Sequence, residues 1–333
     1  MSITRRHAVA AIASTLALGA VGGAQAQEKS VTIRFPFEYA DDVAPGLANQ
    51  AFKKLVEERS NGRIKVQLYP NGSLLKGLDL LQGVVRGDAE MTTLVSAYWV
   101  GVSPKMSVFD LPYAFPTHEA FYKAMDDKAF QKEAFAELES KGVRVLGMLP
   151  YDYVVPGSRK GPIIKPEDFK GLKLRAVGKT NAAALSAIGA TAVAINITEV
   201  STSIQQGVID GLNTPLDAFQ SYRFYESIKN ITYAKYFFAF YPWTVNGKFW
   251  DSLSEADRKL IGDAATETMV GHKPRARQAA DSAKADLAQK GVKFHEQTAD
   301  EAKAWAKAMS PVWEAAEKQF GKPLIEKMRT FGG

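Results

Sequence analysis

The chain has 333 residues, of which 46% are hydrophobic and 23% are charged. This composition is ordinary for a globular protein, offers enough apolar material for two packed domains, and excludes a disordered chain. The formal net charge is +6, but basic and acidic residues are interspersed, which excludes the one-sided Lys and Arg stripe of a nucleic-acid binder. The absence of cysteine excludes catalytic thiols and cysteine-ligated metal sites, and it is consistent with export to an oxidising compartment.

The first 26 residues have the pattern of a secretory signal peptide. Arg5 and Arg6 precede an Ala-rich apolar run over 8–21, and Ala24-Gln25-Ala26 is a small-x-small cleavage pattern. The run is shorter than the ~20 strongly apolar residues of a membrane span, which favours cleavage after Ala26 over an uncleaved anchor. The two arginines fit either the twin-arginine or the general secretory route. We therefore expect a periplasmic mature chain that begins at Gln27.

The first half of the mature chain alternates between strands and helices. Period-2 and helical-period patterns predict strands over 31–37, 64–69, 89–95 and 143–149, and helices over 45–59, 78–86 and 118–141. Thr117 is the expected N-cap of the long third helix, and Gly87 is expected to end the second. Strand–helix–strand units of this kind are typical of a parallel sheet.

The second half repeats the alternation and ends in helices. Strands are expected over 172–177, 191–195, near Gly211 and over 292–295, and helices over 180–188, 199–206 and 252–290, followed by two amphipathic helices. The helix over 252–290 is long enough to lie across both halves, with a bend expected at Pro274. Two α/β halves of similar size predict a cleft between them, where ligands of α/β proteins bind.

Arg175 ends the strand over 172–177, just before Gly178 and a helix. Strand alternation alone would place Leu172 and Leu174 inside and leave Lys173 and Arg175 in solvent. A ligand site is the other interpretation, because the carboxyl ends of such strands face the cleft. These two interpretations are distinguished only by the rest of the chain.

The sequence offers little support for an enzyme. The four histidines are far apart, and neither His-Glu-x-x-His nor Gly-x-Ser-x-Gly occurs. Gly178-Lys179-Thr180 resembles the end of a phosphate-binding loop, but that motif needs a glycine where Lys173 stands. His272, followed by Lys273 and Arg275, is expected at a solvated helix end. We expect no catalytic residue, metal or cofactor, with an exported hydrolase as the alternative.

The order of several motifs from Val31 to about Thr330 resembles a known family. The matching pieces are Glu57-Glu58-Arg59-Ser60-Asn61-Gly62-Arg63-Ile64 with Tyr69-Pro70, Gly87-Asp88-Ala89-Glu90-Met91, Leu111-Pro112-Tyr113-Ala114-Phe115, 166–175 (PEDFKGLKLR), Glu199 with 205–211 (QQGVIDG), and Tyr225-Glu226-Ser227-Ile228-Lys229. Together they resemble the solute-binding proteins of tripartite ATP-independent periplasmic (TRAP) transporters, the dicarboxylate-binding family.

This resemblance implies a bilobal, periplasmic-binding-protein-like α/β fold with a ligand cleft and a long helix spanning both domains. It implies domain I over 27–151 plus about 240–282, and domain II over 152–239 plus about 283–333. Its implied partners are a small organic anion and the small and large TRAP membrane subunits, which are driven by sodium. A ligand sensor for a membrane receptor would share the bilobal fold, and no nucleic-acid partner is implied.

The resemblance also implies that Arg175 holds the ligand carboxylate. A guanidinium suits this role because its planar fork gives two parallel hydrogen bonds. The chain departs from relatives at other pocket positions, where it has Val155 in place of a second arginine, Asn213 and Thr214 before Pro215, and Ile197 in place of an aromatic residue. Fewer cations favour a monocarboxylate or a hydroxy or oxo acid over a dicarboxylate.

Glu38 follows the first strand where relatives have a polar pocket residue. It is either a solvated loop carboxylate or, opposite Arg175, a partner for the cationic part of a zwitterion such as ectoine or an amino acid. Ile197 and Asp217 stand where binders of zwitterions have an aromatic cage, which weakens that alternative. The candidate aromatic walls of the pocket, about half of which are expected to contact ligand, are Tyr39, Tyr98, Trp99, Tyr153 and Trp243.

Overall fold

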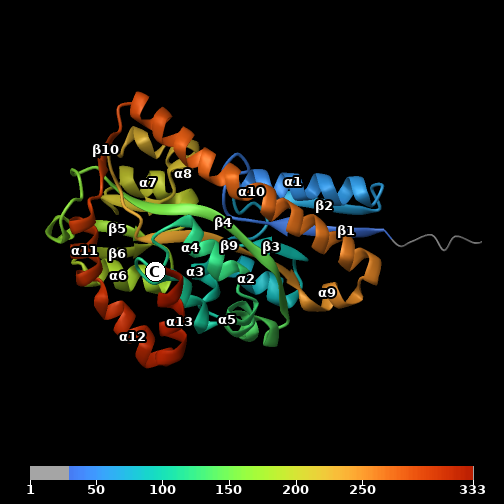
Figure 1. Ribbon diagram of the computed structural model, residues 1–333. Helices are drawn as coiled ribbons and strands as arrows, with labels where there is room; N and C mark the ends of the chain where they lie inside the picture. Colours follow the sequence, from blue (N-terminus) through green and yellow to red (C-terminus); the bar gives the residue numbers. More distant parts are fainter. Residues whose placement is uncertain (1–29, 333) are drawn as a thin grey trace, which may run out of the picture.

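The computed structural model describes residues 30–332, which form a two-lobed α/β fold (Figure 1). The strands are β1 Val31–Pro36, β2 Ile64–Tyr69, β3 Met91–Thr93, β4 Val143–Ser158, β5 Lys173–Ala176, β6 Thr191–Ala194, β7 Gly211–Thr214, β8 Asn230–Tyr233, β9 Phe237–Asn246 and β10 Lys293–Glu296. The expected signal peptide lies outside the described residues. Within 30–332 no helix is both long and apolar enough to span a bilayer.

The α-helices lie between and around these strands. They are α1 Ala44–Arg59, α2 Gly77–Arg86, α3 Ser96–Trp99, α4 His118–Asp126, α5 Lys128–Ser140, α6 Gly178–Ala187, α7 Val200–Gln205, α8 Leu216–Ser221, α9 Gly247–Ser252, α10 Glu255–Gln289, α11 Ala299–Ala308, α12 Ser310–Phe320 and α13 Lys322–Gly332. Short 3₁₀ helices are η1 Pro104–Asp110, η2 Pro166–Phe169, η3 Ile197–Glu199 and η4 Phe224–Glu226.

Strand β4 connects the two lobes. Its first part, from Val143 to Val154, pairs antiparallel with β9. Its last four residues pair with β7 and β8 instead. We call the part around β1, β2, β3, α1 and α2 the first lobe and the part around β5, β6, β7, α6 and α8 the second lobe. One continuous strand therefore belongs to both lobes.

The first lobe follows the sequence pattern closely. β1 and β2 pair in parallel, from Val31 opposite Ile64 to Pro36 opposite Tyr69. In β2, Ile64 and Val66 are buried while Lys65 is exposed, as strand alternation requires. Gly87, with φ of 91°, ends α2 in the left-handed conformation that glycine adopts without a Cβ penalty.

In the second lobe, β5 lies inside the sheet. The strand order is β10-β8-β4-β7-β5-β6, and β5 pairs in parallel with β6 along its length and with β7 at Leu174. A strand with neighbours on both edges and helices around it has little solvent-exposed surface. Arg175 is consequently only 6% exposed, and its expected place in solvent, the simpler of the two interpretations, is wrong.

Helix α10 lies across both lobes, as Figure 1 shows in orange, and it contacts α1, β4 and α8. Its inner face is made of small residues such as Ala264, Ala276 and Ala283, which allow close packing. Pro274, where a bend was expected, lies inside this one helix. His272 is buried rather than at a solvated helix end as expected. Its Nε2 atom donates to the carbonyl of Pro150 in β4 at 2.8 Å.

Several other elements differ from the sequence predictions. The single helix expected over 118–141 is two helices, because the side chain of Asp127 accepts from Phe130 N and caps α5. Thr117 caps α4 as predicted. β8 and β9 were not predicted, and the tail has three helices instead of two. The expected domain boundaries stay a prediction.

Candidate functional site

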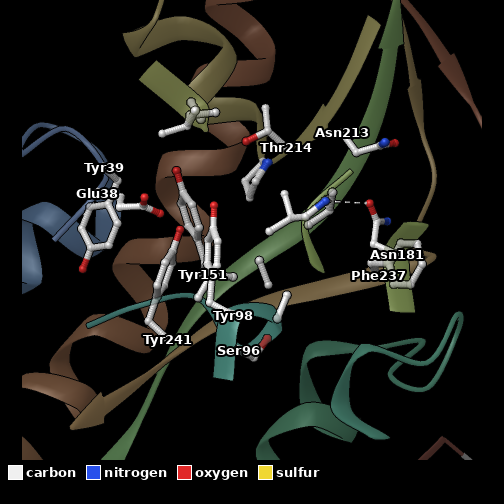
Figure 2. Close-up of a pocket in the computed structure, with 18 of the residues that line it drawn as sticks. Glu38, Tyr39, Ser96, Tyr98, Tyr151, Asn181, Asn213, Thr214, Phe237 and Tyr241 are labelled. Carbon is white, nitrogen blue, oxygen red and sulfur yellow. Dashed lines mark hydrogen bonds between the residues drawn. The ribbon is translucent and has the colours of Figure 1, made fainter. Parts of the chain in front are cut away.

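A cavity of about 870 Å³, including its mouth, lies between the lobes where β4, β5, β7, β9 and α3 meet. Figure 2 shows tyrosines on one side, with Thr214 and Asn213 from β7 above and Ser96 from α3 below. Apart from Arg175, no lysine, arginine or histidine among the described residues lines it. The polar lining residues are Glu38, Tyr39, Thr93, Ser96, Tyr98, Asp110, Tyr151, Arg175, Asn181, Asn213, Thr214, Tyr222 and Tyr241.

Arg175 is held by backbone oxygens rather than by an acid. Its Nε donates to the carbonyl of Ile195 at 2.8 Å and its Nη1 to the carbonyl of Asn213 at 3.4 Å. No hydrogen bond within residues 30–332 uses Nη2, and no carboxylate there lies within 4 Å of the guanidinium. Burial lowers the pKa of Arg175, while the nearby Tyr98 and Glu38 oppose that shift. The group is a buried cation that lacks a close anion.

Asn213 fixes the direction of this guanidinium. Its Nδ2 donates to the carbonyl of Arg175 at 2.9 Å, and its own carbonyl accepts from Arg175. The hydroxyl of Tyr236 donates to Asn213 Oδ1, so the amide is anchored from behind. β7 therefore supports the end of β5 and preorganises the cation.

Glu38 is buried and its carboxylate points toward the centre of the cavity (Figure 2). Its Oε1 accepts from the backbone N–H of Gly77 at the start of α2. Burial raises the pKa of Glu38, and the Gly77 N–H and the charge of Arg175 partly offset this. The interpretation of Glu38 as a solvated loop carboxylate is wrong, because its side chain turns inward from the end of β1.

The tyrosines of the cavity differ in whether their hydroxyl groups have a hydrogen-bond partner within the protein. Tyr39 bonds Thr93 and accepts from Asn49, and Tyr151 donates to Asp217. The hydroxyl of Tyr241 has no partner among the described residues, and the charge of Arg175 acts on its pKa, which burial raises well above 10. Tyr241 is thus a free hydroxyl beside the cation.

Several contacts across the cleft join the two lobes. Two backbone N–H groups of the first lobe reach side chains of the second, from Ala40 to Tyr222 Oη at 2.8 Å and from Ala44 to Asp217 Oδ2 at 3.0 Å. Further contacts join Tyr98 Oη to Asn196 Oδ1 at 3.1 Å, Ser221 Oγ to Asp42 Oδ1 at 2.6 Å, and Lys76 Nζ to Glu199 Oε1 at 3.7 Å.

The structure brings seven of the twelve predicted site residues to this cavity. They are Glu38, Tyr39, Tyr98, Arg175, Ile197, Asn213 and Thr214. Their contact with a ligand stays a prediction.

The other five do not line the cavity, which corrects their expected place. Val155 turns into the core, and its neighbour Val154 lines the cavity because adjacent strand residues face opposite sides. Asp217 turns its carboxylate to Ala44 N and Tyr151 Oη. Trp99, Tyr153 and Trp243 are core residues.

These three aromatic residues are each no more than 1% exposed. Trp99 Nε1 donates to the carbonyl of Leu94, and Tyr153 Oη donates to the carbonyl of Phe115. Trp243 packs against Phe52 with ring centroids 4.8 Å apart. Large apolar side chains at such positions stabilise the fold through burial.

Sequence reasoning missed Ser96, Asp110, Tyr151, Asn181, Tyr222, Phe237 and Tyr241, all of which line the cavity. The run over 236–245 (YFFAFYPWTV) is the kind of continuous apolar segment that indicates a fully buried strand, and it could have located Tyr241. The other missed residues carry no local signal. No group of three His, Asp or Glu side chains in the described part could hold a metal ion.

Residues 40–319 match the family described as bacterial extracellular solute-binding protein, family 7. The chain belongs to this family. Its members bind solutes and are not enzymes, as the sequence predicted. The chain is 29% identical over 331 residues to the C4-dicarboxylate-binding periplasmic protein of Rhodobacter capsulatus, covering 98% of each chain. It is 30% identical to a solute-binding protein of Verminephrobacter eiseniae, covering 90% of this chain and 89% of that one.

Solved structures of family members have the same fold. A TRAP periplasmic solute-binding protein of Shewanella oneidensis with bound succinate superposes with a TM-score of 0.87 and 27% identity, covering 91% of this chain and all of that one. The sugar acid binding protein of Advenella mimigardefordensis in complex with galactonate gives a TM-score of 0.87 at 26% identity, covering 91% and 98% of the two chains. These matches confirm the bilobal fold and the predicted TRAP resemblance.

Proposed function

We propose that this family 7 protein captures a small organic acid with one carboxylate, a monocarboxylate or a hydroxy or oxo acid, by closing its lobes around it. The signal sequence over 1–26 would direct it to the periplasm, where it would deliver the ligand to the small and large TRAP membrane subunits for sodium-driven uptake. Succinate and galactonate, bound by the two solved relatives, support an organic acid as the class of ligand.

The observation that carries the proposal is the charge of the cavity. Arg175 is the one cation among the described lining residues, and two of its guanidinium nitrogens are bonded only to carbonyls. Burying a cation is costly unless an anion or several acceptors meet it. A ligand carboxylate on Arg175 would neutralise the charge, whereas a second carboxylate would find no cation. This charge balance supports a ligand with one carboxylate.

A zwitterion such as ectoine or an amino acid is the second candidate, and Glu38 supports it. Its buried carboxyl group faces the cavity and is close enough to Arg175 to be affected by that charge. A cationic group on the ligand would pair with Glu38 while the ligand carboxylate pairs with Arg175.

A thermal-shift screen of residues 27–333 followed by calorimetry tests the proposal. The panel holds mono- and dicarboxylates, sugar acids, amino acids and ectoines. A ligand that binds only the folded protein raises its stability by roughly 2.7 kcal/mol at a hundredfold excess over the dissociation constant, so a micromolar ligand is visible. We expect monocarboxylates to bind more tightly than dicarboxylates of equal length, and tighter binding of dicarboxylates would contradict the charge argument.

The variant Arg175→Ala tests whether the ligand binds at this site. Since the variant leaves the ligand carboxylate without its partner, we expect a loss of roughly 2–5 kcal/mol in binding free energy. Affinity that survives this change nearly intact would remove Arg175 from the site. Mass spectrometry of the denatured protein detects a ligand that is retained through purification.

A further inference from the structure

Asp110 is a half-buried residue of the cavity whose carboxyl group the proposed carboxylate site does not use. It ends η1 and lies among the lining residues. Its Oδ1 accepts from Ser96 Oγ at 2.8 Å. Its Oδ2 is buried and has no hydrogen-bond partner within residues 30–332. Half of this carboxyl group is therefore unsatisfied.

An unsatisfied buried carboxyl oxygen is costly and rare in native proteins. Burial raises the pKa of Asp110 to about 7, and only the hydrogen bond from Ser96 opposes this. No described cation contributes to that pKa, so no lysine or arginine compensates the group. Asp110 lines the cavity, and a rotation about the last torsion of its side chain, which is a soft one, would present Oδ2 to a molecule bound there.

Asp110 and Arg175 serve different ends of the cavity. Arg175 Nη1 donates to the carbonyl of Asn213, and Figure 2 shows Asn213 and Thr214 above the cavity. Figure 2 shows Ser96, the partner of Asp110, on the side of the cavity away from Thr214 and apart from Glu38. A ligand whose carboxylate meets Arg175 would extend its other end toward Ser96 and Asp110.

We propose that Asp110 accepts a hydrogen bond from a donor on the ligand, a hydroxyl or an ammonium group, at the end remote from the carboxylate. This inference rests on the proposed function, since it takes the ligand carboxylate to lie on Arg175. It specifies the class of ligand further, to acids with a distal donor. A distal methyl group on the ligand would leave Oδ2 unsatisfied. A distal carboxylate would place its acceptor oxygens against the acceptor oxygens of Asp110.

The test measures dissociation constants by calorimetry for monocarboxylates of three to six carbons, each with its terminal hydroxy and amino derivative and its dicarboxylate. Butyrate, 4-hydroxybutyrate, 4-aminobutyrate and succinate form one such set. The proteins are the wild type, Asp110→Leu, Asp110→Asn and, as the control for the carboxylate end, Arg175→Ala. Thermal unfolding without ligand reports the stability of each variant.

In the wild type we expect the donor-bearing acid of the best-fitting length to bind at least tenfold more tightly than its unsubstituted parent, the ratio that one charge-assisted hydrogen bond gives. Asp110→Leu should abolish this ratio, while Arg175→Ala weakens binding of both the parent acid and its donor-bearing derivative. Asp110→Leu removes an unsatisfied oxygen but also the acceptor of the buried Ser96 hydroxyl, so we expect its thermal stability to change little. The hydroxy and amino derivatives show which donor is preferred.

The outcomes separate the two proposals. A wild type that binds acids through Arg175 without preferring a distal donor overturns the inference and leaves the proposed function standing. An unchanged ratio in both Asp110 variants does the same, whether or not their stability falls. Failure of every acid to bind overturns the proposed function and the inference with it.

Discussion

Gly178 at the start of α6 lies directly against Ala97 of α3 across the cleft. A Cβ atom on Gly178 would lie 2.6 Å from Ala97 Cβ and 2.9 Å from Ala97 O, closer than real Cβ atoms approach other atoms. α3 follows β3 of the first lobe and α6 belongs to the second, so this contact lies between the lobes. The missing side chain of Gly178 therefore allows the two lobes to approach this closely.

We expect Gly178→Ala to weaken ligand binding at least tenfold, because the lobes cannot close fully around the ligand and closure supplies the tighter-binding state. Gly178 has φ of +75°, so alanine also strains the backbone. Gly171→Ala is the matched control, because Gly171 has φ of +73° and open space around its Cβ position. Equal affinity losses in the two variants would contradict the role of close approach.

Tyr241→Phe tests the free hydroxyl beside Arg175. We expect affinity to fall about tenfold, the effect of one hydrogen bond to a charged ligand group, with little change in unfolding temperature, since no described residue bonds this hydroxyl. Tyr153→Phe is the contrast: its hydroxyl bonds Phe115 O in the core, so stability should fall by about 1 kcal/mol and affinity should persist. Calorimetry and thermal unfolding of both variants decide this.

The ion pair between Lys76 and Glu199 at the mouth should matter little. Both side chains are more than half exposed, at 57% and 51%, and exposed pairs contribute ~0–1 kcal/mol. We expect Lys76→Ala to reduce affinity less than about fivefold at low ionic strength, and the difference from wild type to vanish in about 1 M salt, where charges are screened within ~3 Å. A large loss that persists at high salt would assign Lys76 a direct role in binding.

His272 should make the protein less stable in acid. Burial lowers the pKa of His272 to about 4 from its ordinary 6.5. Between pH 6.5 and 4, His272 is protonated in the unfolded chain but not in the folded protein. Its contribution to stability is therefore complete above pH 6.5 and falls as the pH drops toward 4, by about 3 kcal/mol in total.

His272→Gln keeps a donor for Pro150 O and removes the titration. Denaturant unfolding at pH 8, 6 and 4.5 should show the variant losing less stability than the wild type on acidification. The difference between the proteins at pH 8 reports only the hydrogen bond. Parallel pH profiles would show that His272 is protonated equally in the folded and unfolded chain. Comparing the two proteins cancels the opposite effect of Asp217, whose pKa burial raises to about 6.

Local sequence determined much of the first lobe and the identity of the cation. The alternation of apolar and polar residues over 64–69 predicted the bounds of β2, because a strand with one buried face and one solvent-exposed face must be apolar on the buried face. The motif that ends in Arg175 could be recognised because it is continuous in sequence. The helix over 252–290 was predicted to span both halves, since its length alone exceeds a single domain face.

Tertiary structure decided which side chains face the ligand. Arg175 is buried because β6 and β7 flank β5, and neither pairing can be seen in the strand itself. Trp99 and Trp243 look like pocket walls in sequence but pack in the core, while Asp110 and Tyr241 reach the cavity from η1 and β9. Periodicity in the sequence predicts that a segment forms a helix or a strand. Which of its side chains are buried, and which face a ligand, depends on contacts with segments far apart in the chain.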